Sequence, residues 1–129
     1  MLKAAASAVD TGHRFHAAVF LSEVRYDGDK LVLTLTCPDE VQQAVTTFTE
    51  VVGFRLLDEG NLLEFWPRCA ADHGWLFEIS ENGWFAQESL RSGFLSSDAP
   101  GITEYFVVST NDCLNVVAGA RPTVEIHAV

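Results

Sequence analysis

Carboxylates are the side chains of this sequence with the greatest capacity for chemistry, and Glu88 stands out among them. A tight turn at Asn82-Gly83 would place Glu88 on an apolar strand face, opposite Phe77. A carboxylate in that position must pair with a cation, take up a proton or lie at the open rim of the sheet. We therefore keep two interpretations of Glu88: exposure at the rim or an ion pair with Arg55 or Arg91, and a ligand-facing or catalytic group.

A second acidic group lies further back in the sequence, where Asp58 and Glu59 follow Arg55 by three and four residues. Glu64 and Trp66 come shortly afterwards. Local pairing with Arg55 is one interpretation, and an acidic rim with Trp66 as its aromatic anchor is the other. The charge distribution favours such a rim in the second half, because residues 1–55 hold 5 basic and 7 acidic side chains whereas residues 56–129 hold 3 and 11.

Sequence motifs for other chemistry are lacking. There is no G-x-S-x-G turn for a nucleophilic serine and no glycine-rich loop followed by lysine for a phosphate. The three cysteines are dozens of residues apart, so we expect reduced, packed thiols and neither a metal knuckle nor a disulfide framework. We expect no cofactor, although a metal site assembled from Cys69, Asp72 and His73 stays open.

The elements that must position these residues are mostly strands. Apolar alternation and turn residues predict three hairpins, two single strands and a final edge strand. The hairpins are 14–24 with 31–37, 75–90 about its turn at 82–83, and 103–110 with 113–118; the other strands are 50–57, 62–66 and 123–128. Both faces of the 103–118 hairpin are apolar, which indicates that it is covered on both sides.

One short helix is predicted at 38–48. Pro38 suits a first helical position, and Val41, Ala44, Val45 and Phe48 recur at helical spacing. The resulting fold class is α+β, predominantly antiparallel β, with successive hairpins forming a curled sheet or barrel-like structure. We divide the chain into a flexible N-terminal segment at 1–12 and a single β-rich domain at 13–129.

Composition limits the partners of this chain. The 129 residues carry a formal net charge of −10, which disfavours nucleic acid and acidic membrane surfaces. No apolar run approaches the roughly 18–20 residues of a membrane span and no secretory signal begins the sequence, so we expect a cytoplasmic protein. The predicted edge strand at 123–128 could pair with a second copy and form a homodimer.

Two functions compete on these observations. The first is a non-enzymatic acidic domain, of the inhibitor or immunity type, that captures a basic protein partner through Asp58, Glu59, Glu64 and Trp66. The second is a small-ligand or enzymatic site in the mouth of a curled sheet, lined by aromatic side chains and one carboxylate. Its predicted lining residues are Trp75, Phe77, Trp84 and Glu88.

Overall fold

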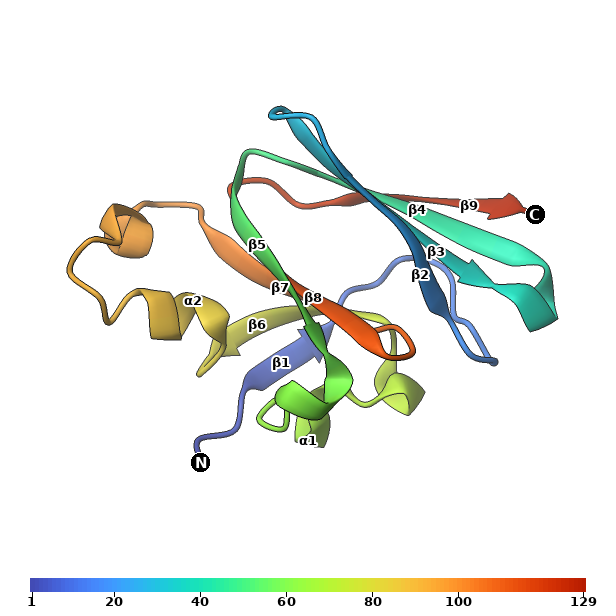
Figure 1. The fold of residues 1–129 in the computed structure, drawn as a ribbon, viewed down its shortest axis with the longest axis horizontal. Coiled ribbons are helices and arrows are strands. Elements are labelled where there is room, and N and C mark those ends of the chain that lie inside the picture. The colour runs from blue at the N-terminus through green and yellow to red at the C-terminus, as the bar shows by residue number, and fades with distance from the viewer.

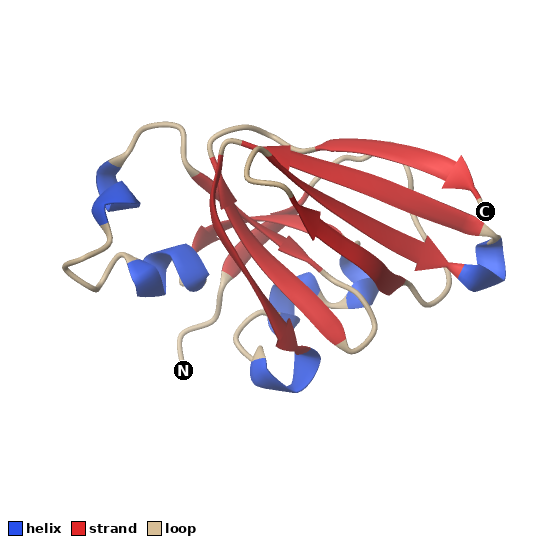
Figure 2. Cartoon of the chain, turned by 45° about the horizontal axis from the view of Figure 1, so that its top comes forward, coloured by secondary structure: helices blue, strands red, loops and turns tan.

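The computed structural model describes residues 1–129 and contains nine strands in two antiparallel sheets (Figure 1). In chain order the strands are β1 (Ala5–Ala8), β2 (Phe20–Tyr26), β3 (Lys30–Cys37), β4 (Gln42–Thr49), β5 (Val51–Asp58), β6 (Leu76–Glu81), β7 (Thr103–Val107), β8 (Asp112–Ala118) and β9 (Thr123–Ala128). One sheet has the order β1-β6-β7-β8-β5 and the other β2-β3-β4-β9. The predicted α+β class with mainly antiparallel strands is confirmed, and the sheets curl without closing into a barrel (Figure 2).

The first predicted hairpin exists as β2 and β3, and the apolar face of β3 contributes to the main core, whereas β2 is mostly exposed. Leu31, Leu33 and Leu35 are fully buried between the two sheets, as the alternation of β3 predicts. The strand predicted from Arg14 begins only at Phe20, because residues 9–19 form no regular element. We call these residues the strap, which joins β1 to β2.

The helix predicted at 38–48 is wrong. Only a 3₁₀ turn forms at Pro38–Glu40, and β4 follows it. Ala44, Thr46 and Phe48 are fully buried in alternation, which is the period of a strand. β-Branched threonines favour extended backbone, and β4 gains ladder hydrogen bonds from β3 on one side and β9 on the other.

The prediction that the 103–118 hairpin is covered on both sides is confirmed. Tyr105 and Val107 of β7 pack with Leu114 and Val116 of β8 in the main core between the sheets. Phe106, on the opposite face of β7, belongs to a second core. That core also contains Leu62, Phe65, Cys69, Phe77, Val108 and Cys113.

The strand predicted at 62–66 is also wrong. The predicted turn at 58–61 contains a 3₁₀ segment at Glu59–Asn61, and the chain then enters the short helix α1 (Trp66–Cys69). Leu62, Phe65 and Cys69 are buried at spacings of three and four residues, so this segment follows a helical period and covers the second core. Pro67 lies in the first turn of α1, where its missing N–H costs no hydrogen bond.

The hairpin predicted at 75–90 has only its first strand, β6. Asn82 adopts a left-handed conformation, but Gly83 has φ −97°, whereas a type I′ turn needs positive φ at both positions. The chain enters helix α2 (Trp84–Glu88) instead. Gly83 is required there, since a Cβ would lie 2.6 Å from a carboxylate oxygen of Glu104.

Glu104 explains why a helix starts at this point. Its side chain is only 2% exposed and accepts hydrogen bonds from the backbone N–H groups of Trp84, at 3.1 Å, and Phe85, at 2.7 Å. Asn115 donates a third hydrogen bond to the same carboxylate at 2.9 Å, and Arg55 Nε donates to Asn115 at 2.8 Å. The Arg55 guanidinium lies over the Trp84 ring, 5.5 Å from its centroid.

The ends of the chain lie on sheet edges. The segment 1–12, for which we predict flexibility, contains β1, which pairs with β6. β9 lies at the edge of the four-stranded sheet, as predicted, with Glu125 and His127 in contact at 3.3 Å. α2, with five residues, is the longest α-helix, and no helix has the length and hydropathy needed to cross a membrane.

Replacing Glu104 by glutamine is expected to give a pH-dependent loss of stability. Burial raises the pKa of Glu104 above its ordinary value of 4.5, outweighing the hydrogen bonds that favour the ionised form. The folded protein then holds this proton more tightly than the unfolded chain, so the contribution to stability is largest below pH 4.5 and declines as pH rises through the folded pKa. We expect Glu104→Gln to lower the free energy of unfolding by about 1–3 kcal/mol, with the difference from the wild type shrinking as pH rises.

Urea unfolding of both proteins across the acidic pH range measures this difference. Glu81→Gln is the control, because Glu81 is exposed on β6 and accepts no side-chain hydrogen bond. A gap between wild type and Glu104→Gln that stays constant across this range would contradict the assignment.

Candidate functional site

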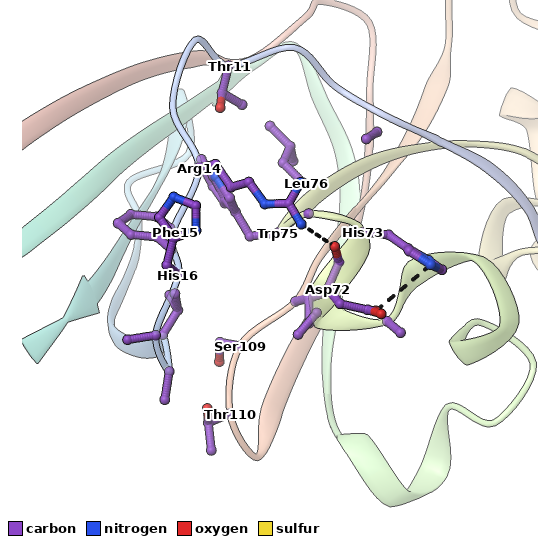
Figure 3. Close-up of a pocket in the computed structure, with 18 of the residues that line it drawn as sticks. Thr11, Arg14, Phe15, His16, Asp72, His73, Trp75, Leu76, Ser109 and Thr110 are labelled. Atoms are coloured by element: carbon purple, nitrogen blue, oxygen red, sulfur yellow. Dashed lines mark hydrogen bonds and ion pairs between the residues drawn. The ribbon is translucent and has the colours of Figure 1, made fainter. Parts of the chain in front are cut away.

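A pocket of about 900 Å³ lies beneath the strap (Figure 3). Its other walls come from the segment before β6, from the turn after β7, from the 3₁₀ segment after β5 and from α1. Half of its 24 lining residues are apolar. Pockets of about 300–1,000 Å³ with apolar walls and a few placed polar groups are typical of small-molecule sites.

The backbone of β6 and its flanks fixes the floor of this pocket. Val9 N–H donates to Leu76 O and Val108 N–H donates to Trp75 O, both at 2.9 Å, so chain from either side holds the start of β6. Thr110 N–H donates to Val19 O at 2.7 Å and ties the end of the strap to the turn after β7. The pocket therefore sits on backbone that is hydrogen-bonded to its neighbours.

The middle of the strap is held only by side chains. Arg14 donates to the Asp72 carbonyl at 2.5 Å, as Figure 3 shows, and the Glu40 carboxylate accepts from His16 N–H at 3.2 Å. Residues 10–18 make no backbone–backbone hydrogen bond to any other part of the chain. Segments with few backbone hydrogen bonds open at lower free-energy cost than laddered strands, although Phe15 and Val19 of the strap are buried in the main core.

Three aromatic rings follow one another along the pocket wall. His13 meets Phe15 edge-on at 4.7 Å between ring centroids, and Phe15 meets Trp75 at 5.8 Å. Trp75 is 5% exposed, and its indole Nε1 has no hydrogen-bond partner. His13 Nε2 is also buried without a partner. Two of the residues that line the pocket, His13 and Trp75, thus each carry a buried nitrogen without a partner.

Groups suited to covalent chemistry are already committed or shielded. Ser109 donates its hydroxyl to the Asp112 carbonyl at 2.5 Å. The three cysteines are free and buried, as predicted, and burial raises the pKa of Cys69 to about 12 and that of Cys113 to about 11. Thiols with such pKa values remain protonated near neutral pH and are poor nucleophiles.

The predicted acidic rim is brought together in part. Asp58, at the end of β5, faces Asp112 directly across the ladder to β8, and Glu59 is the next residue. Trp66 lies beside them, since its indole N–H donates to Glu59 O at 3.0 Å, and both residues line the pocket. None of the three carboxylates forms an ion pair.

Glu64 and Glu88 belong to a different group, around α2. Glu64 accepts from Gln87 at 3.3 Å, and Glu88 accepts from the Trp84 indole at 3.2 Å and pairs with Arg91 at 2.5 Å. Of the two interpretations of Glu88, the structure shows the ion pair, and Arg91 lowers the pKa of this carboxyl. Trp84 and Glu88 line a separate cavity of about 220 Å³.

The aromatic site predicted in the mouth of the sheet is therefore divided. Trp75 lines the large pocket, Trp84 and Glu88 line the small cavity, and Phe77 lies in the second core. The strap residues are absent from the predicted site, because the sequence predicts a single strand at 14–24. The Asp10-Thr11-Gly12 turn is the signal that could have identified a loop.

No group of three or more His, Cys, Asp and Glu side chains in the structure could hold a metal ion. Asp72 and His73 lie 3.9 Å apart at the pocket, whereas Cys69 is buried in the second core.

Comparison with known proteins gives no match to a protein-family model, to a curated protein or to a solved structure. The function must therefore be argued from the site itself.

The like-charge pair on β5 and β8 is expected to lower stability. Asp112 has no hydrogen-bond partner for its carboxylate and faces Asp58 across the ladder, so Asp112→Asn removes repulsion without removing a contact. We expect the variant to gain about 0.2–1 kcal/mol in free energy of unfolding at low salt, and less at high salt. Urea unfolding at both salt concentrations measures this gain. Asp98→Asn, an exposed site outside the sheets, is the control, and an equal effect of both substitutions would refute the repulsion.

Proposed function

We propose that this protein binds a small organic molecule in the 900 Å³ pocket beneath the strap. The observation that carries the proposal is the pocket itself, which has the volume and mixed lining of a ligand site. Its apolar wall of Phe15, Trp66 and Trp75 suits a ligand with an aromatic or alicyclic body. Burial of such a body against aromatic rings would supply most of the binding free energy.

Binding is favoured over covalent catalysis by the state of the nucleophiles. The hydroxyl of Ser109 is used by backbone, and the cysteine thiols face the cores. Asp72 and His73 form the carboxylate–imidazole pair of the pocket, but no serine or cysteine completes a nucleophile–base arrangement with them in the structure. The pocket residues thus support recognition of a ligand.

Filling the pocket is expected to abolish the binding of an aromatic probe. Anilinonaphthalene sulfonate, an aromatic dye that fluoresces in apolar sites, should bind the wild type with a stoichiometry of one. Ala70 lines the pocket at the end of α1, so Ala70→Phe should weaken this binding by about tenfold or more, because the added ring occupies the same volume. A fluorescence titration measures the affinity.

Ala99→Phe is the matched control, because Ala99 is exposed and outside the pocket. Unfolding curves establish that both variants are folded. Absence of dye binding to the wild type, or equal binding by the two variants, would overturn the proposed function.

A second candidate function is capture of a basic protein partner, and the acidic rim of Asp58, Glu59 and Asp112 favours it. These carboxylates are exposed, unpaired and adjacent, an arrangement that weakens the fold and that a cationic partner would relieve. The net charge of −10 would also raise the encounter rate with such a partner. Trp66, half-buried beside the rim, supplies the aromatic anchor.

Removing the charges of the rim distinguishes capture of a basic partner through these residues from a general effect of the negative net charge. We expect Asp58→Asn/Glu59→Gln/Asp112→Asn to lose a basic partner that the wild type retains from host lysate at moderate salt. The control removes three carboxylates elsewhere, with Asp39→Asn/Asp98→Asn/Glu125→Gln, and therefore has the same net charge. Equal recovery by the two triple variants, or no basic partner for the wild type, would contradict capture through this rim.

A further inference from the structure

The three tryptophans differ in the hydrogen bonding of their indole N–H groups. Trp66 donates to Glu59 O at 3.0 Å and Trp84 donates to the Glu88 carboxylate at 3.2 Å. Trp75 is the most buried of them, at 5% exposed, and its N–H has no acceptor. A buried donor without an acceptor costs about 1–3 kcal/mol, and natural proteins keep few of them.

A second unpaired nitrogen lies on the same wall. His13 Nε2 is buried without a partner, and the His13 ring is joined to Trp75 through Phe15 by two edge contacts. Imidazole nitrogen donates in one tautomer and accepts in the other. In the donating tautomer, His13 and Trp75 together offer two N–H groups within a wall of aromatic rings.

Arg14 adds charge to this set of donors. It is the only Lys or Arg side chain of the pocket lining, and one of its guanidinium nitrogens is used by the Asp72 carbonyl. Its remaining N–H groups have no partner within the protein. Guanidinium groups pair bidentately with oxygen anions such as carboxylates and phosphates.

The carboxylates that line the pocket would favour a cationic ligand, but they are exposed to solvent, unlike the two unpaired nitrogens. Asp10, Glu59 and Asp72 are exposed, so water solvates them without a ligand. Asp10 also accepts from Gly12 N–H at 3.0 Å, and Asp72 contacts His73. The buried nitrogens have no such alternative, which gives them the larger influence on which ligand binds.

We propose that the ligand of this pocket is an aromatic or alicyclic carboxylate, whose oxygens accept hydrogen bonds from Trp75 and His13 and pair with Arg14. This inference rests on the proposed function and assigns its ligand class. Both unpaired nitrogens are shielded from solvent, so the strap must shift to admit the carboxylate. Its middle, at 10–18, has no backbone–backbone hydrogen bond to the rest of the chain, so the shift would break the hydrogen bonds of Arg14 and His16 and the packing of Phe15.

Three probes of one shape distinguish the ligand classes: naphthoate, naphthylmethylamine and methylnaphthalene, which are an anion, a cation and a neutral hydrocarbon. Calorimetric titration of the full chain should show naphthoate binding roughly tenfold to a hundredfold more tightly than methylnaphthalene, because only naphthoate pairs the donors. In the heteronuclear NMR spectrum, naphthoate should move the Trp75 indole N–H signal more than those of Trp66 and Trp84, whose donors are already bonded.

Trp75→Phe tests the N–H directly, since it keeps an aromatic ring and removes the donor. The preference for naphthoate over methylnaphthalene should fall by about tenfold in this variant. Trp66→Phe also changes a pocket tryptophan, but its N–H is used by Glu59, so it should alter the affinities of both probes alike. Should Trp75→Phe fail to fold, the Trp75 indole signal of the wild type remains the deciding measurement.

The outcomes separate this inference from the function on which it rests. Equal affinities for naphthoate and methylnaphthalene, tighter binding of naphthylmethylamine, or an unmoved Trp75 signal would overturn the carboxylate assignment while the pocket still binds aromatic probes. If none of the probes binds and the dye titration also fails, the proposed function falls and the inference with it.

Discussion

The buried carboxylate of Glu104 is the interaction on which the placement of the polar side chains depends. An ionised carboxylate is stable out of water only when donors surround it, and here two of the three donors are the first N–H groups of α2. The helix is thereby fixed to β7, and the Trp84 ring lies against Arg55. Asn115 supplies the third donor to Glu104, and its side-chain oxygen accepts from Arg55 Nε and so orients the guanidinium. One buried group therefore orders a helix, an amide and a guanidinium.

The way in which the two faces of the five-stranded sheet are covered explains where the large pocket forms. One face of β6, β7 and β8 packs on the four-stranded sheet, and the other is covered by α1 and the chain around it or by α2. The strap runs from one sheet to the other without a ladder partner, so a space remains between it and the start of β6. Backbone hydrogen bonds from Val9 and Val108 keep this floor in place, and the unpaired nitrogens of His13 and Trp75 stay shielded while the strap lies over it.

Local patterns predicted the elements whose environment matches their own period. The alternation of Leu31, Leu33 and Leu35 gave the core face of β3, and the two apolar faces around Tyr105 and Phe106 gave a hairpin covered on both sides. Local patterns failed to predict the structure where a side chain distant in the sequence determines the backbone conformation. Asn82-Gly83 has the residues of a tight hairpin turn, yet a carboxylate more than twenty positions later binds the N–H groups of Trp84 and Phe85. The prediction of the candidate site failed for the same reason. The wall of the pocket comes from segments that are far apart in the sequence and come together only in the folded chain.

In the binding that we propose, the negative charge of the chain and the unpaired donors of the pocket would act at different stages. Exposed carboxylates near the pocket, such as Glu59 and Asp72, interact through water and are screened by salt, so they would govern mainly the rate of encounter. The Trp75 N–H is buried where the effective dielectric is low, so a hydrogen bond made there contributes more to affinity and an unmade one costs more. A ligand carboxylate would meet slight repulsion outside and strong pairing inside. Affinity would then follow the buried donors, and the acidic rim would chiefly make association slower and dependent on salt.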